Sequence, residues 1–272
     1  EPVPENGRSC PCTGSYVCSD FSELDKVCIP REGICALGLN LTGDAGSPAT
    51  HVIEGGACDF GSFDGGIITP IDDVEDIDPN FSGGGVTSFW FESKDSSEGC
   101  GQFKIDPIPG GRCGSQYAVR LVMAGLSDWG AQVGFSLKPN PASSTELEPL
   151  DISQYAGIQF LARSGSTSTP PQLQVKLVDA SGAPSAGQCR PDAGPQDPGA
   201  CYIPFLKEVD LANDSEWHAY RVSFAELTRN EVKTSPPDLA HAYQILWGIA
   251  PALDPNEWGQ FDLWIDDVAW YR

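Results

Sequence analysis

The sequence predicts an all-β fold built as a β-sandwich or a barrel. From about residue 67 onward, short segments alternate between apolar and polar residues, which is the period-2 pattern of a half-buried strand. Turn clusters rich in Pro, Gly and Ser separate these segments, and the 272 residues include 30 Gly and 23 Pro. Only two short helical turns are expected, near 152–155 and 224–229. Many short strands with frequent turns are typical of sandwiches and barrels.

Eight strands are expected in this region. The clearest alternation lies in 172–179, where Leu173, Val175 and Leu177 share one face. The segment 157–163 repeats the pattern with aliphatic and aromatic residues at every second position. The expected strands cover residues 86–92, 117–124, 132–137, 157–163, 172–179, 217–223, 243–249 and 261–271.

The cysteines divide the chain into a small module, 1–65, and a sandwich domain, 66–272. Six of the ten cysteines fall in 1–65, where periodic apolar patterning is nearly absent, so disulfides are expected to supply the stability that a small core lacks. An even number of cysteines predicts full pairing in an oxidising compartment. Metal binding is the alternative, but Cys10 and Cys12 lack the usual knuckle spacing and the three histidines are scattered. The expected bridges are three among Cys10, Cys12, Cys18, Cys28, Cys35 and Cys58, one between Cys100 and Cys113, and one between Cys189 and Cys201.

The charge balance excludes one class of partner. A net charge of −22 and a pI of about 4.2 argue against binding to a nucleic-acid backbone, which needs clustered Lys and Arg. No segment reaches the roughly 18 apolar residues of a membrane span. The acidity has two interpretations, solubility outside the cell and, for its clusters, coordination of calcium. Together with the cysteines, it predicts a secreted or cell-surface protein.

Six segments carry a resemblance to a known family: 71–75, 129–135, 155–163, 173–179, 216–224 and 261–271. Through them, residues 67–272 resemble the jelly-roll carbohydrate-binding modules of bacterial secreted glycanases. The similarity is to family 11-like modules and to related galactose-binding-like domains of myxobacterial secreted proteins. The resemblance implies a jelly-roll β-sandwich that binds polysaccharide across a concave sheet, with a structural calcium shared by the first and last strands. Residues 1–65 lie outside it.

Two acidic runs, 71–78 and 261–272, are the candidate calcium ligands. Alternation directs one of the adjacent pair Asp266 and Asp267 toward the core, where a carboxylate must be paired, hydrogen-bonded or metal-bound. Asp73 and Glu75 are expected to share one face of the first strand. Carried over from the resemblance, the predicted ligands are Asp73, Glu75, Asp78, Asp266 and Asp267. The alternative is a solvated acidic edge that discourages strand-to-strand association.

Outward-facing polar residues are the candidate sugar contacts. If Ile245 and Trp247 face the core, Gln244 faces outward, and the same reasoning applies to the polar residues of 157–163 and 172–179. Trp90 is expected on the exposed face, opposite its two phenylalanine neighbours, and Trp258 lies in a loop. The predicted carbohydrate-binding residues are Trp90, Gln159, Arg163, Gln174, Lys176, Gln244 and Trp258. Aromatic platforms with planar hydrogen-bonding groups suit a sugar ring, although any solvated sheet face shows a similar polar row.

No catalytic signature accompanies these candidates. The Gly-x-Ser-x-Gly elbow, the His-Glu-x-x-His pair, the phosphate loop and the dinucleotide fingerprint are all missing from the sequence. We therefore expect a non-catalytic targeting or adhesion module whose partner is a polysaccharide or a surface glycan. The alternative is a cell-surface structural protein that assembles with copies of itself into an extracellular fibre, with the jelly roll as a scaffold.

Overall fold

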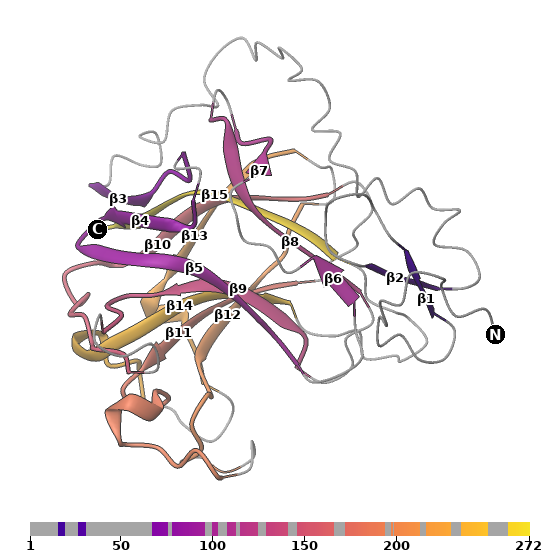
Figure 1. Ribbon diagram of the computed structural model, residues 1–272. Helices are drawn as coiled ribbons and strands as arrows, with labels where there is room; N and C mark the ends of the chain where they lie inside the picture. Colours follow the sequence, from indigo (N-terminus) through magenta and orange to yellow (C-terminus); the bar gives the residue numbers. More distant parts are fainter. Residues whose placement is uncertain are drawn as a thin grey trace.

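The computed structural model is a sandwich of two antiparallel β-sheets (Figure 1). It describes residues 16–19, 27–30, 67–75, 78–95, 100–102, 108–112, 115–124, 129–140, 146–165, 172–193, 197, 199–212, 216–229, 235–249 and 261–272. The prediction of a jelly-roll β-sandwich is confirmed. Within the described part of the chain, no helix is both long enough and apolar enough to cross a membrane.

One sheet has seven strands, and the last strand of the chain lies at its centre. Its order is β13, β10, β15, β8 and β6, with β3 pairing to β15 and β7 to β8. These strands are β3 (Ile68–Asp72), β6 (Cys100–Gln102), β7 (Ile108–Pro109), β8 (Tyr117–Ala124), β10 (Gly157–Ser164), β13 (His218–Ser223) and β15 (Phe261–Tyr271). The first and last strands of the sandwich are therefore neighbours, as the resemblance implied.

The other sheet has six strands, in the order β12, β11, β14, β9, β5 and β4. These strands are β4 (Asn80–Gly83), β5 (Val86–Lys94), β9 (Ala131–Ser136), β11 (Leu173–Asp179), β12 (Phe205–Val209) and β14 (Ala242–Ile249). Helical structure in the described residues is confined to three 3₁₀ turns, η2 (Pro184–Ala186), η3 (Phe224–Glu226) and η4 (Leu239–His241). The turn expected near 224–229 is η3, and its N-cap Ser223 forms a capping box with Glu226.

The core lies between the sheets and follows the predicted alternation. Leu173, Val175 and Leu177 of β11 all face it and are at most 1% exposed. An aromatic cluster joins the two sheets, because the ring centroid of Phe160 from β10 lies 5.5 Å from that of Trp247 from β14. Both residues are fully buried, and burying such large rings is a dominant source of stability in a sandwich.

Before residue 67, the structure describes only a small hairpin. β1 (Tyr16–Ser19) and β2 (Val27–Pro30) pair in antiparallel fashion, and Cys18 stands opposite Cys28 in their register. The prediction of a three-bridge module over 1–65 otherwise falls outside the described residues, as do Cys10, Cys12, Cys35 and Cys58. Cys113, the expected partner of Cys100, lies outside them as well.

Candidate functional site

The outer face of the six-stranded sheet carries the candidate site. Two outward rows cross β5, β9, β14 and β11: one consists of Phe91, Gly134, Leu246 and Lys176, and the next of Ser93, Gln132, Gly248 and Gln174. The two glycines occupy the central strands. A Cβ on Gly134 would lie 2.2 Å from the carbonyl oxygen of Ile245, so no side chain fits there. The centre of this face is consequently low, with larger side chains on both sides.

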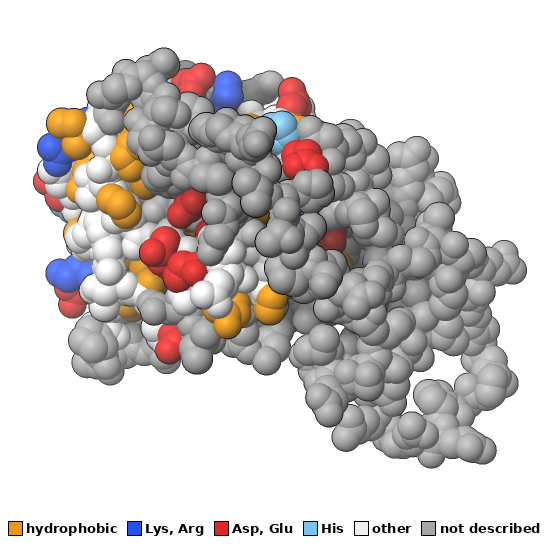
Figure 2. Space-filling model, turned by 90° about the horizontal axis from the view of Figure 1, so that it is seen from above, with side chains coloured by type: hydrophobic (Ala, Val, Ile, Leu, Met, Phe, Trp, Pro, Cys, Tyr) orange, Lys and Arg blue, Asp and Glu red, His pale blue; other side chains and the backbone are white. Residues whose placement is uncertain are grey.

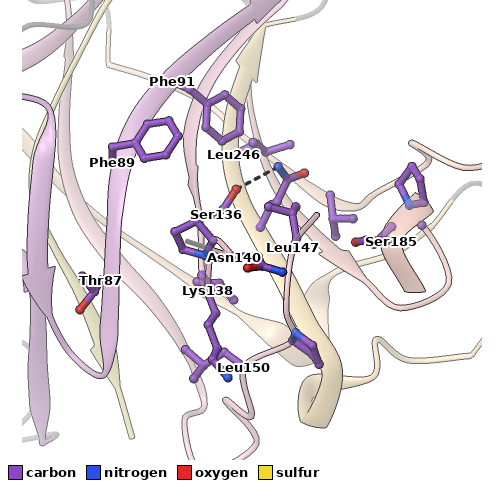
Figure 3. Close-up of a pocket in the computed structure, with 18 of the residues that line it drawn as sticks. Thr87, Phe89, Phe91, Ser136, Lys138, Asn140, Leu147, Leu150, Ser185 and Leu246 are labelled. Atoms are coloured by element: carbon purple, nitrogen blue, oxygen red, sulfur yellow. Dashed lines mark hydrogen bonds between the residues drawn. The ribbon is translucent and has the colours of Figure 1, made fainter. Parts of the chain in front are cut away.

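A groove of about 1040 Å³ opens on this face (Figure 3). Residues of β5, β9 and β14 line it, together with the segments 137–140 and 182–185, with Tyr202, and with Leu147, Pro149 and Leu150. Figure 3 shows the rings of Phe89 and Phe91 on one side and Ser185 on the other, with Leu246 between them. The volume is in the range of pockets that take a small ligand or a few units of a polymer.

Aromatic side chains stand on both sides of this groove. On β5, Phe89 is 45% exposed and Phe91 is half-buried. Across the groove, Tyr202 is 70% exposed and has a φ of +65°, a left-handed conformation that a tyrosine rarely adopts. Strain of this kind persists only where the surroundings impose it, and it is concentrated at functional sites.

The surroundings of Tyr202 do impose its position. The preceding residue, Cys201, forms a disulfide with Cys189, as the sequence predicted. The amide of Tyr202 also donates to the carbonyl oxygen of Gly182 at 2.9 Å. Beneath the loop, the buried guanidinium of Arg229 donates to the carbonyl oxygen of Ser181 at 3.3 Å and to that of Ala200 at 3.4 Å. The loop 181–202 is thus anchored from both of its ends.

The polar groups of the groove are oriented by one another. Gln244 donates from Nε2 to the hydroxyl of Ser136 at 3.4 Å, the bond drawn in Figure 3. Gln132 is held at both ends of its amide: its Nε2 donates to Ser93 Oγ at 3.0 Å, and its Oε1 accepts from Lys176 Nζ at 3.2 Å. Amides held in this way present fixed donors and acceptors, which reduces the ordering cost of binding.

Lys176 is the unusual member of this network. The residue is 7% exposed, and its Nζ and Cε lie against Gly248, where a Cβ would be 2.5 Å and 2.8 Å from them. Burial lowers the pKa of the ammonium group from 10.5 to about 8. Among the residues that the structure describes, no carboxylate pairs with it, and its hydrogen-bond partner is Gln132.

Three of the predicted sugar contacts lie on this face. Gln244 lines the groove, and Gln174 and Lys176 continue the outward row on β11. Trp90 was predicted to be exposed, and this is wrong: it is 2% exposed and donates from Nε1 to Asp72 at 2.6 Å inside the core. Trp258 lies outside the described residues.

Gln159 and Arg163 were expected in the same row, but they lie on the outer face of the seven-stranded sheet. β10 and β11 belong to different sheets, so their outward faces point in opposite directions. Gln159 is 1% exposed and accepts from Arg221 Nε at 2.8 Å. The guanidinium of Arg163 stacks on the rings of Trp264, at 4.2 Å, and Trp217, at 5.1 Å. Both residues are part of the packing of that sheet.

The groove residues that sequence reasoning missed are Phe89, Phe91, Gln132 and Tyr202. The glycine at position 134 was an available signal, because a glycine inside a strand marks a close approach of other groups. No local sequence pattern near Tyr202 indicates that its side chain is exposed on an anchored loop.

The acidic residues predicted to bind calcium lie where β3 ends beside β15. Val74 has a φ of +55°, so the strand stops at Asp72, and Asp73 and Glu75 follow it in place of sharing one strand face. Oε1 of Glu75 accepts from Ser115 Oγ at 2.6 Å and from the amide of Gln116 at 2.8 Å. Glu75 therefore ties this segment to the start of β8.

Asp266 and Asp267 interrupt the alternation of β15. Asp267 has a φ of +48°, and Asp266 is fully buried, accepting from the amide of Arg112 at 3.0 Å. Burial raises the pKa of Asp266 to about 7. Burial also raises the pKa of Asp267 to about 6, where the Arg112 charge opposes the rise and the negative charges of Asp73, Glu75 and Asp72 add to it.

These carboxylates are close enough to repel one another but do not form a ready cation site. No group of three or more Asp, Glu, His or Cys side chains in the described ranges is arranged to hold a metal ion. Asp78 is exposed and accepts from the backbone and side-chain amides of Asn80, which lower its pKa. In Figure 2, acidic side chains gather in a small group on the described part of the face seen from above. A bound cation would have to draw Asp73, Glu75 and Asp267 together.

Similar folds are found among solved structures. No protein-family model and no curated protein sequence matches this chain. A family 11 carbohydrate-binding module from Clostridium thermocellum, solved with a β-1,3-1,4-mixed-linked tetrasaccharide, is 13% identical; the match covers 75% of this chain and 95% of that one, with a TM-score of 0.43. A family 30 carbohydrate-binding module of a cellulosomal cellulase of the same organism is 10% identical, covering 66% and 89%, with a TM-score of 0.40. An exo-β-agarase is 12% identical, covering 75% of this chain and 24% of that one, with a TM-score of 0.41. Each match is a similarity of fold at low sequence identity. The ligand of this chain must therefore be inferred from the residues of its groove.

Proposed function

We propose that this protein is a secreted, non-catalytic module that binds carbohydrate in the groove of the six-stranded sheet. The observation that carries the proposal is the combination of exposed aromatic rings with oriented amides in one groove. A sugar ring has apolar faces and a rim of hydroxyls, so it stacks on rings such as Phe89 and Tyr202 while its hydroxyls meet Gln132 and Gln244. A polymer strand lying along the groove would contact both sides at once.

The groove chemistry supports binding without cleavage. Glycoside hydrolysis uses a pair of carboxylic acids on either side of the scissile bond. None of the described residues that line this groove is an Asp or a Glu, although the chain has 38 of them. A ligand in the groove would therefore meet donors and rings and no acid–base pair.

Affinity gel electrophoresis against a panel of soluble polysaccharides tests the proposal. We expect at least one polymer to retard the protein, and Phe89→Ala and Tyr202→Ala each to weaken this roughly three- to tenfold through the loss of ring stacking. Trp129→Ala is the matched control, because Trp129 is 41% exposed but does not line the groove. A folded protein that no polymer retards would overturn the proposal. Concentration-dependent mass in light scattering would then favour assembly with copies of itself.

The proposal includes a structural Ca²⁺ ion held by Asp73, Glu75 and Asp267, joining the first and last strands. The mutual repulsion of these carboxylates supports it, because a divalent cation would relieve that repulsion. Thermal melts with Ca²⁺ and with chelator are the test. We expect Ca²⁺ to raise the Tm, Asp73→Asn to abolish the effect, and Asp78→Asn to leave it intact, since Asp78 is exposed and is not among the carboxylates that raise the pKa of Asp267. Equal Tm values with Ca²⁺ and with chelator would exclude the ion.

A further inference from the structure

We propose that the polysaccharide taken by this groove is acidic, carrying carboxylate or sulfate groups, and that Lys176 is the residue that recognises the negative charge. This inference rests on the proposed function and narrows its ligand class. The observations behind it are the charge of the groove, the surroundings of Lys176 and the glycine beneath its ammonium group.

The described residues that line the groove include no Asp or Glu, although the protein is strongly acidic. The chain has 38 acidic and 16 basic residues, yet among these described lining residues the charged side chain is a lysine, Lys138. Lys138 is neutralised by Glu148, whose Oε2 lies 2.6 Å from its Nζ. An ammonium group donates hydrogen bonds and cannot accept them, whereas a carboxylate or sulfate group accepts them. A groove whose described lining has no carboxylate, with the ammonium group of Lys176 beside it, suits a ligand that brings negatively charged acceptors.

Lys176 is a buried cation for which the described residues provide no carboxylate partner. Its Nζ has three hydrogens, and the bond to Gln132 Oε1 uses one of them. A buried, unpaired ammonium group is costly to the fold, so its presence at a binding face indicates a partner that arrives with the ligand. Gln132 lines the groove and is hydrogen-bonded to Lys176, so the ammonium group lies directly behind a groove-lining side chain.

Gly248 permits this arrangement. The lysine stem crosses β14 at this residue to reach β9, and any Cβ at position 248 would lie 2.5 Å from Nζ. Gly248→Ala is compatible with the backbone, since the φ of Gly248 is not in the left-handed region, and the flexible end of Lys176 would move away. The substitution therefore keeps the positive charge but displaces it from Gln132.

The test compares polymers that share a backbone and differ in charge. Polygalacturonate is run against highly methyl-esterified pectin for the carboxylate, and carrageenan against chemically desulfated carrageenan for the sulfate, with retardation measured by affinity gel electrophoresis. We expect the charged member of one pair to bind about tenfold or more tightly than its neutral counterpart, the scale of a charge-assisted hydrogen bond. The pair that shows the difference identifies the source of the charge.

Three variants complete the design. Lys176→Met and Gly248→Ala are expected to remove the preference, so that the charged polymer and its neutral counterpart bind equally well to each variant. Lys207→Met is the control, since Lys207 is half-buried on β12 and its ammonium lies 3.6 Å from a carboxylate, that of Glu226. Equal binding of charged and neutral polymers by the unaltered protein would overturn this inference and leave the proposed function standing. A preference that survives Lys176→Met would also overturn it, and the absence of binding to every polymer would overturn both.

Discussion

Replacing Lys176 by Met should make the protein more stable near pH 7. Burial of the ammonium lowers its pKa from 10.5 to about 8, and each pH unit of such a difference corresponds to about 1.4 kcal/mol. The charged lysine therefore costs the folded state about 3 kcal/mol. Replacing the lysine leaves Gln132 Oε1 without its hydrogen-bond donor, which lowers the stability of the variant by about 1 kcal/mol. A net gain of about 2 kcal/mol follows.

The stability advantage of Lys176→Met over the wild type should disappear as the pH rises. Below pH 8 the lysine is protonated in both the folded and the unfolded chain, so the wild type bears the full cost. Between about pH 8 and 10.5 the unfolded chain holds a proton that the folded chain has released, so wild-type stability rises with pH by up to about 1.4 kcal/mol per unit. The variant has no such group, and the difference between the two proteins closes.

Urea unfolding followed by tryptophan fluorescence, run on both proteins from about pH 6 to about pH 10, measures this difference. Subtracting one curve from the other removes the titration of every shared group. A wild type that equals or exceeds Lys176→Met in stability near pH 7 would refute the reasoning, as would a gap that stays constant with pH. A more stable variant that has lost its charge preference cannot owe that loss to misfolding.

Two further predictions concern residues around the groove. Trp90→Phe should lower the free energy of unfolding in urea by about 2 kcal/mol, because the buried carboxylate of Asp72 loses the indole donor at 2.6 Å. Retardation by polysaccharide should stay the same, and weakened retardation would instead place Trp90 at the ligand. Replacing Cys189 and Cys201 together by Ala should lower stability by up to about 3 kcal/mol, given the separation of 12 residues, and should weaken retardation as Tyr202 loses its anchor. Unchanged affinity in that double variant would show that the remaining contacts of the loop suffice.

Alternation predicted the core-facing side of a strand well where aliphatic residues recur at every second position. Leu173, Val175 and Leu177 form such a run, so only one orientation buries all three. At 89–91 the sequence is aromatic throughout, and the period carries no information about which face is inside. In the structure, the indole of Trp90 points inward and donates a hydrogen bond to Asp72, which lies 18 residues away in the chain. The flanking phenylalanines point outward.

The division of strands between the two sheets was beyond sequence reasoning. Gln159 and Gln174 have similar local patterns, yet β10 pairs with β15 and β13 while β11 pairs with β14 and β12. Partner choice depends on contacts between residues far apart in the chain, which a local pattern does not contain. Two of the five residues in the predicted polar row, Gln159 and Arg163, therefore lie on the opposite side of the sandwich.

The position of β15 has a consequence for how the chain folds. It is synthesised after every other described strand of the sandwich, yet its neighbours β8, β10 and β3 all depend on it for their ladders. Until Phe261–Tyr271 has left the ribosome, β8 and β10 expose unpaired edges, and these are open to association with other chains. The pairing of β3 with β15 spans about 200 residues of chain, so folding is expected to be slow, as in other proteins of high contact order. A chain cut before residue 261 should aggregate rather than retain a partial sandwich.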